Sequence, residues 1–230
     1  MAKPEQDTAG VEQEIEKAET FMDETWAPVA MVLVFITELI YILSAAGTPD
    51  LRSNPLSFLA FAGKIPSWVT GLVSGLAWVA IYVAIYQKLR GVKALQPIAL
   101  ALMVATIASS FFEMLPYEDV IFGEEFAWYY SEGDYILTYL NYFLVLAETV
   151  LGVILFILLM TRYSGLVKDV GQWGLVYTGA SIVWLVFGLL HIAFYDVGSV
   201  TSFFVMLSLV SLYVMVKFLN LIYYFVTDDE

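Results

Sequence analysis

Residues 199–226 read SVTSFFVMLSLVSLYVMVKFLNLIYYFV, an apolar stretch interrupted by one cation, Lys217. About 20 apolar residues in a helix cross the hydrocarbon core of a bilayer, so this stretch predicts a transmembrane helix with Lys217 inside the membrane. A lysine near the bilayer centre costs about 2.5–3.5 kcal/mol on insertion scales. We therefore expect an acidic partner for Lys217 on another helix of the same protein.

Five further apolar stretches precede this one, and each is long enough to cross a membrane. They cover about residues 27–47, 67–88, 96–116, 135–161 and 172–195. Only 14% of the residues are charged, whereas a soluble domain carries about 25%. The sequence predicts an all-α, polytopic transmembrane helical bundle with six spans in residues 26–227. An acidic tail at residues 1–25 and an acidic end at residues 228–230 flank it.

Basic residues are distributed unevenly between the two sides of the predicted bundle. One side carries Lys3, Lys17, Lys88, Arg90, Lys93, Arg162 and Lys168, and the other carries Arg52 and Lys64. Because cytoplasmic loops are enriched in lysine and arginine, the richer side is predicted to be cytoplasmic. Both termini then lie in the cytoplasm, and the protein is predicted to be a multi-pass protein of the plasma membrane.

Composition excludes several function classes. The chain has no cysteine and one histidine, so disulfides, thiolate metal sites and histidine-built metal sites are not expected. No arrangement of a nucleophile with a base is evident, and we expect no enzymatic activity. The 23 acidic residues against 10 basic ones give a net charge of −13. This balance argues against nucleic acid as a partner and is typical of adaptation to high salt.

Ionisable residues inside the predicted spans are candidates for an ion or proton pathway, because such residues face a protein interior or a water-filled cavity. Glu38 and Glu148 fall at the middle of the first and fourth spans, while Glu113 and His191 fall near the outer ends of the third and fifth. Burial favours the protonated form of a carboxylate, and a nearby lysine favours the charged form. A carboxylate on which these two effects nearly balance can bind and release a proton.

Helical spacing places polar or aromatic residues on one face of each of three spans. The stripes are Tyr213, Lys217, Asn220 and Tyr224; Tyr177, Ser181, Trp184, Gly188, His191 and Tyr195; and Thr138, Asn141, Val145, Glu148 and Gly152. Lipid offers no hydrogen-bond partners, so we expect the three stripes to converge on one interior seam. The alternative interpretation is that an ion pair of Lys217 with Glu148 or Glu38 only fixes the register of the helices.

A single lysine just past the centre of the last helix resembles the retinal-binding lysine of microbial rhodopsins. The spacing from Trp68 to Tyr82, followed by KLRGV at residues 88–92, is similar to the first helix of that family, and YILT at 135–138 with Glu148 beyond is similar to its third. The resemblance implies retinal as a cofactor on Lys217.

The resemblance also implies that Tyr177, Trp184 and Tyr213 lie around this retinal. Leu137 stands at the family's counterion position and Tyr213 at that of its second aspartate. A carboxylate such as Glu148, Glu38 or Glu113 would therefore replace the counterion. The family has seven spans, and six are predicted here.

Three functions follow from these patterns. The first is transport or channelling of protons or small cations by the buried carboxylates and Lys217, with the lipid bilayer and these ions as partners. The second is an opsin-like photoreceptor or pump. The third is a non-transporting structural subunit, in which the buried charges hold helices together or bind a second copy or another protein of a membrane complex.

Overall fold

The structure is a computed structural model that describes residues 10–12, 15, 18–22, 24–46, 64–65, 67–114, 132–193 and 198–227, with only the backbone at several helix ends. Its long elements are all helices. They are α2 (Trp26–Ala46), α3 (Ser67–Leu89), α4 (Gln96–Met114), α5 (Glu132–Arg162), α6 (Gly165–Ala193) and α7 (Gly198–Thr227). The prediction of an all-α fold is confirmed, and each helix overlaps one of the predicted apolar stretches.

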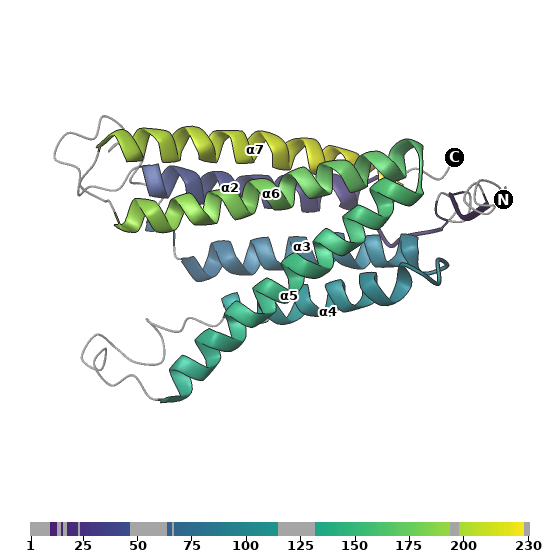
Figure 1. Cartoon of the computed structure of the whole chain (residues 1–230), viewed down its shortest axis with the longest axis horizontal. Helices are drawn as coiled ribbons and strands as arrows, with labels where there is room; N and C mark the ends of the chain where they lie inside the picture. Colours follow the sequence, from purple (N-terminus) through teal and green to yellow (C-terminus); the bar gives the residue numbers. More distant parts are fainter. Residues whose placement is uncertain are drawn as a thin grey trace.

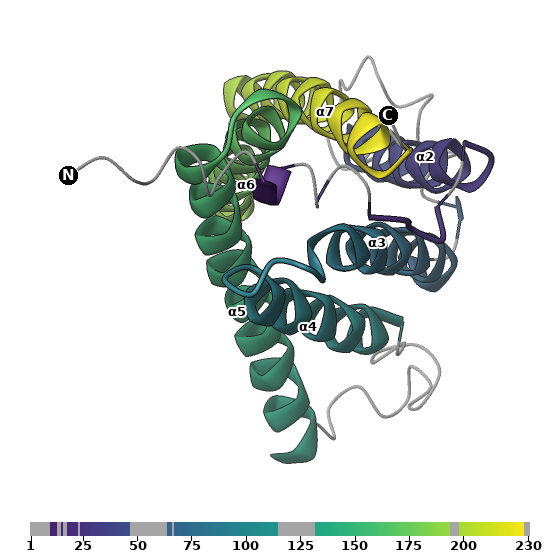
Figure 2. The same cartoon turned by 90° about the vertical axis from the view of Figure 1, so that its right-hand side faces the viewer.

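Successive helices run in opposite directions, so α2 begins and α7 ends at the same end of the bundle (Figure 1). We call this the proximal end; the short turns between α3 and α4 and between α5 and α6 also lie there. Seen from this end, the helices follow one another around the bundle, with α5 inclined to the others (Figure 2). Packing of α2 against α7 closes the arrangement.

Among the residues that the structure describes, three helices contain stretches that are long and apolar enough to cross a membrane. These are Val69–Leu89 in α3, Phe143–Arg162 in α5 and Met206–Thr227 in α7. At 1.5 Å per residue, about 20 residues span the hydrocarbon core of roughly 30 Å. Shorter apolar stretches, Trp26–Ile40 and Gln96–Phe111, lie in α2 and α4. The length and composition of these helices indicate a helical membrane protein.

Two glycines of α6 allow it to lie very close to α5. A Cβ atom built at Gly171 would lie 2.8 Å from the carbonyl oxygen of Phe156, and one at Gly174 would lie 2.5 Å from the Phe156 ring. A side chain at Gly171 would force the two backbones apart, and one at Gly174 would displace the Phe156 ring. The first residue of α6, Gly165, has a φ of +54°, a left-handed conformation that glycine adopts without steric penalty.

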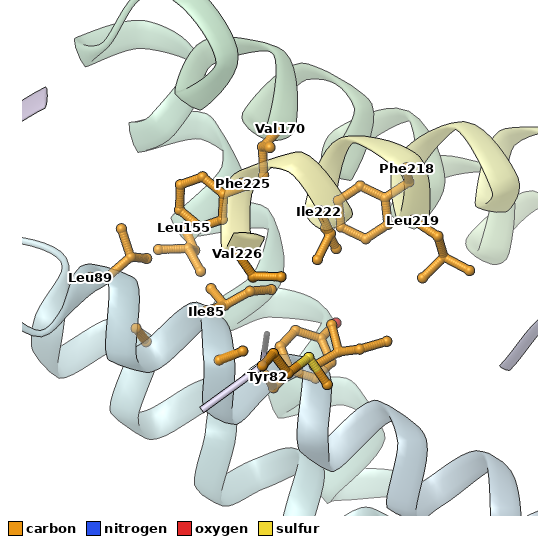
Figure 3. Packing of buried hydrophobic residues seen from close by; sticks show 14 of the residues in the cluster. Tyr82, Ile85, Leu89, Leu155, Val170, Phe218, Leu219, Ile222, Phe225 and Val226 are labelled. Atoms are coloured by element: carbon orange, nitrogen blue, oxygen red, sulfur yellow. The ribbon is translucent and has the colours of Figure 1, made fainter. Parts of the chain in front are cut away.

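The buried apolar side chains of all six helices, α2 to α7, gather in one cluster towards the proximal end. Figure 3 shows Ile85 and Leu89 of α3 in the same cluster as Ile222 and Phe225 of α7. The cluster also includes Ile15 and Met22, which precede α2 in the chain and are 1% and 2% exposed. The N-terminal residues therefore contribute to the core of the bundle.

Hydrogen bonds fix this N-terminal segment, residues 10–22, to three helix ends. The Ser164 amide donates to Glu12 Oε1 at 2.6 Å and the Phe21 amide to Gln87 Oε1 at 2.8 Å. The Thr20 hydroxyl lies within donating distance of the Val226 carbonyl, at 3.0 Å, and of the Met22 carbonyl, at 2.9 Å. The described residues of the predicted acidic tail up to residue 22 are thus packed on the proximal end of the bundle. Residues 1–9 and 228–230 lie outside the described part of the chain.

The contact between Glu12 and the turn after α5 also affects Tyr163, which follows α5. Burial raises the pKa of the Tyr163 hydroxyl above its ordinary value. The positive charge of Arg162 lowers this pKa, and the negative charge of Glu12 raises it further. The pKa of Tyr163 therefore depends on whether Glu12 of the N-terminal segment lies close to the end of α5.

Candidate functional site

A polar cavity lies inside the bundle between α3, α4, α5 and α6. Its volume is about 360 Å³, and it is lined mainly by hydroxyl and aromatic side chains around one carboxylate, that of Glu148. The hydroxyl groups come from Ser74, Thr106, Ser109, Ser110, Thr149, Thr178 and Ser181. Polar groups inside a membrane protein line water-filled or substrate-binding cavities, so this is the candidate functional site.

Glu148 is half-buried on α5 and binds two hydroxyl groups of α4. The Thr106 hydroxyl lies 3.0 Å from Glu148 Oε1, and the Ser109 hydroxyl lies 2.9 Å from Oε2. Thr106 and Ser109 are themselves buried and lie three residues apart, on one face of α4. Both oxygens of the carboxylate therefore have a hydroxyl partner from the neighbouring helix.

Each of these hydroxyl groups also has a second acceptor within reach. Thr106 Oγ1 lies 3.0 Å from the Leu102 carbonyl oxygen, and Ser109 Oγ lies 3.2 Å from the Thr106 carbonyl oxygen. A hydroxyl carries one hydrogen and donates one bond at a time. The single hydrogen on each hydroxyl can therefore point to the Glu148 carboxylate or back to its own helix, with the heavy atoms in the same positions.

Aromatic rings form one wall of the site and join three helices. The Trp78 ring stacks on Tyr82 and Tyr177 with centroid distances of 5.8 and 5.6 Å, and Tyr177 stacks on Phe218 at 5.2 Å. The Glu148 carboxylate acts electrostatically on the phenol groups of both tyrosines. These phenols bring two further proton-bearing groups to the neighbourhood of Glu148.

Glu38 also belongs to the interior. It follows Ala30 and Val34, which are buried, and precedes the buried Ile42 at steps of four residues, which places all four on one face of α2. The Glu38 carboxylate acts electrostatically on the Tyr177 phenol, as Glu148 does. Two of the predicted pathway residues, Glu38 on α2 and Glu148 on α5, therefore lie on inward faces of the bundle.

Lys217 lies elsewhere. The polar stripe of α7 exists as predicted, but it is exposed on the outer side of the bundle: Tyr213, Lys217, Asn220 and Tyr224. The opposite face of α7 packs inward through Met215, Phe218, Ile222 and Phe225. The expectation that this stripe joins the interior seam and that Lys217 meets Glu148 or Glu38 is corrected. Periodicity identifies residues that share a face of a helix. It does not show which face packs against the other helices, and in α7 this is the apolar face of Met215, Phe218, Ile222 and Phe225.

The other two stripes fit the site where they are described. Val145, Glu148 and Gly152 of α5 and Tyr177 and Ser181 of α6 line the cavity. Glu113, Asn141, Trp184 and His191 lie in helices, and their side chains lie outside the described part of the structure. So do the side chains of Trp68 and of residues 135–138, on which the resemblance to rhodopsins depends in part.

Three residues of the site, Thr106, Ser109 and Tyr82, were not predicted from the sequence. Hydroxyl side chains often return a hydrogen bond to their own helix, so ATIASS at residues 105–110 carries no distinct signal. Lys88, one of the basic residues on the side predicted to be cytoplasmic, has a side chain that is 1% exposed in the last turn of α3. There its charge complements the negative end of the helix dipole.

Comparisons with known proteins were made at the level of family, sequence and structure. No family model matches the chain, and no curated protein or solved structure matches it either. The function is therefore inferred from the chemistry of the cavity and the apolar helices around it.

Proposed function

We propose that this protein transports protons across a membrane through the cavity, with Glu148 as the residue that binds and releases the proton. The observation that carries this proposal is the pair of hydroxyl groups at Glu148, each of which has a second acceptor on its own helix. This arrangement accommodates the carboxylate with and without a proton.

The hydrogen-bond count differs between the two states of Glu148. When Glu148 is charged, the Thr106 and Ser109 hydroxyls both donate to it. When Glu148 is protonated at Oε1, its O–H donates to Thr106 Oγ1, whose own hydrogen turns to the Leu102 carbonyl, while Ser109 still donates to Oε2. Every donor has an acceptor in both states, so proton exchange needs only the rotation of one hydroxyl.

The surroundings of Glu148 supply a route for the proton. The hydroxyls of Thr149, Thr178 and Ser181 donate to their own helices at 2.8, 2.9 and 3.0 Å, which leaves oxygen lone pairs for water in the cavity. Water molecules bound to several such groups form hydrogen-bonded chains. Tyr177 and Glu38 would continue the route towards α2.

A small cation is the alternative substrate of the same site. Carboxylate and hydroxyl oxygens are the ligands that hard cations prefer, and the polar atoms of the cavity are mostly of this kind. A cation would have to displace the hydroxyl hydrogens from Glu148 and collect several oxygens around itself. A proton is favoured as the substrate because the hydrogen bonds of Thr106 and Ser109 satisfy Glu148 in both its charged and its protonated form.

The transporter is proposed to cross the plasma membrane six times with both termini in the cytoplasm. The proximal end, where α2 begins and α7 ends, would then be cytoplasmic, in agreement with the excess of lysine and arginine near it. An opsin-like function would require the Lys217 amine at the interior cavity. The exposed position of this side chain does not favour that function, and it removes Lys217 from the proposed pathway.

The test is proton flux in proteoliposomes loaded with a pH-sensitive dye, with an imposed pH gradient and a potassium–valinomycin clamp. Wild-type protein is expected to dissipate the gradient faster than empty liposomes, and Glu148→Gln to remove this increment. Glu24→Gln is the matched control, because Glu24 is exposed ahead of α2. Replacing the pH gradient by a sodium gradient with a sodium dye tests the alternative substrate.

Flux that survives in Glu148→Gln would show that Glu148 is not the carrier. Flux of sodium in place of protons would assign the cavity to a cation. Wild-type liposomes that behave as empty ones under both gradients would reject transport and favour the structural-subunit function.

A further inference from the structure

The exposed stripe of α7 presents a lysine at the middle of a membrane-spanning stretch. The stretch Met206–Thr227 is long and apolar enough to cross a membrane, and Lys217 lies eleven residues after its start and ten before its end. The side chains around Lys217 on this face, Tyr213 and Asn220, are also exposed. Lipid alone would leave the ammonium group without a partner at this depth.

Lipid headgroups are a poor substitute for such a partner. At 1.5 Å per residue, Lys217 lies about 15 Å from either end of the stretch, more than twice the reach of its side chain. The nearer boundary is at the C-terminal end of α7, whereas the Cα–Cβ bonds of a helix tilt towards its N-terminus. Snorkelling to the proximal surface would therefore work against the direction in which the side chain leaves the helix.

A second copy of this chain does not supply the partner through its described residues. The mid-span carboxylates among them are Glu38 and Glu148, and both belong to the interior of the bundle, as shown above. Two copies that met through this face of α7 would bring their Lys217 side chains together, and like charges in a medium of low dielectric repel strongly.

We propose that the face of α7 formed by Tyr213, Lys217, Asn220 and Tyr224 binds a transmembrane helix of another membrane protein that carries an aspartate or glutamate at mid-depth. The carboxylate of that helix pairs with the Lys217 ammonium group. Tyr213 and Asn220, one turn to either side, supply hydrogen bonds that flank the ion pair. Hydrogen bonds between polar side chains promote the association of transmembrane helices. This proposal does not depend on the proposed transport function.

The test uses a synthetic helix as the probe. A polyleucine peptide of about 20 residues carries one central glutamate and an acceptor dye, and a second peptide carries glutamine at the same place. The protein, which has no cysteine, is labelled with a donor dye through Glu24→Cys and reconstituted in liposomes of neutral lipid. Energy transfer then measures association of each peptide.

The glutamate peptide is expected to associate about tenfold more tightly than the glutamine peptide, which corresponds to about 1.4 kcal/mol. Lys217→Met should bring both to the same level, and Lys217→Arg should retain the preference. Lys168→Met is the matched control, because Lys168 is exposed in the first turn of α6. Folding of the variants is checked by helix content.

Equal association of the two peptides with the wild-type protein would overturn the proposal. So would energy transfer between donor- and acceptor-labelled copies of the protein that depends on Lys217, since a second copy would then occupy the face. Loss of the glutamate preference when 30% anionic lipid is added would assign the Lys217 ammonium group to lipid phosphate instead.

Discussion

Gly171→Ala tests the close packing of α5 and α6, which holds Glu148 in its place beside α4. The added Cβ would lie 2.5 Å from the Met160 amide nitrogen and 2.8 Å from the Phe156 carbonyl oxygen. Favourable contacts lie at about 3.5–4.0 Å, so the two backbones must separate by about 1 Å.

The magnitude follows from two opposing effects. Overpacking costs about 1–3 kcal/mol, and a clash with backbone atoms belongs at the upper end of this range. Replacing glycine by alanine in a helix gains about 1 kcal/mol. Gly171→Ala is therefore expected to destabilise the protein by about 2 kcal/mol. Gly179→Ala, with no atom within 4 Å of its Cβ, should stabilise it by up to about 1 kcal/mol.

The assay is reversible unfolding in mixed micelles, followed by the fluorescence of tryptophans such as Trp173, which packs against the core. The two variants should differ by about 3 kcal/mol, with opposite signs relative to the wild type. Equal effects of the two substitutions would refute the described contact between α5 and α6.

Three further predictions concern the cavity and the N-terminal segment. Thr106→Val removes a hydrogen bond to a charged group, worth about 1.5–3 kcal/mol, and should slow proton flux at least tenfold. Thr161→Val is the matched control: its hydroxyl donates to the Ile157 carbonyl, away from the cavity, so flux should change little, and equal slowing would contradict the assignment. Glu12→Ala removes the acceptor of the Ser164 amide and hydroxyl, so amide hydrogen exchange in residues 10–22 should accelerate about tenfold or more, while unchanged exchange would show that this contact does not hold the segment. The same substitution removes a negative charge that raises the pKa of Tyr163, so this pKa should fall, as read from the ultraviolet difference spectrum between the variant and wild-type protein; a pKa that stays or rises would argue against the described proximity.

The fold class could be predicted because a bilayer restricts the chain to a few solutions. An apolar stretch of 20 residues must satisfy all backbone hydrogen bonds internally, and a helix does so. The predicted stretches therefore anticipated α2 to α7 closely. Shared faces also followed from periodicity, as the stripe of Val145, Glu148 and Gly152 shows.

Which face of a helix packs inward could not be predicted. In a membrane, lipid and the protein interior both accept apolar side chains. The sequence therefore does not show whether a stripe such as Tyr213 to Tyr224 faces the lipid or the other helices. The choice depended on the fit of Phe218 and Ile222 to α3, α5 and α6. The burial of Ile15 and Met22 was missed for a related reason, since two apolar residues in a polar segment give no periodic signal.

The partners of Glu148 could not be predicted either, because hydrogen bonds between α4 and α5 depend on the rotation of both helices. The position of α5 depends in turn on its packing against α6, including the glycines Gly171 and Gly174 that let these two helices approach. Thr106 and Ser109 become visible as a pair only when the positions of α4 and α5 are known.

The most direct test of the central claim is infrared difference spectroscopy of the protein in lipid as the pH is stepped up and down. A carboxylic C=O band that appears and disappears reversibly, is absent in Glu148→Gln and persists in Glu24→Gln is the predicted result. Spectra in which Glu148→Gln retains every carboxylic band of the wild type would contradict proton exchange at this residue.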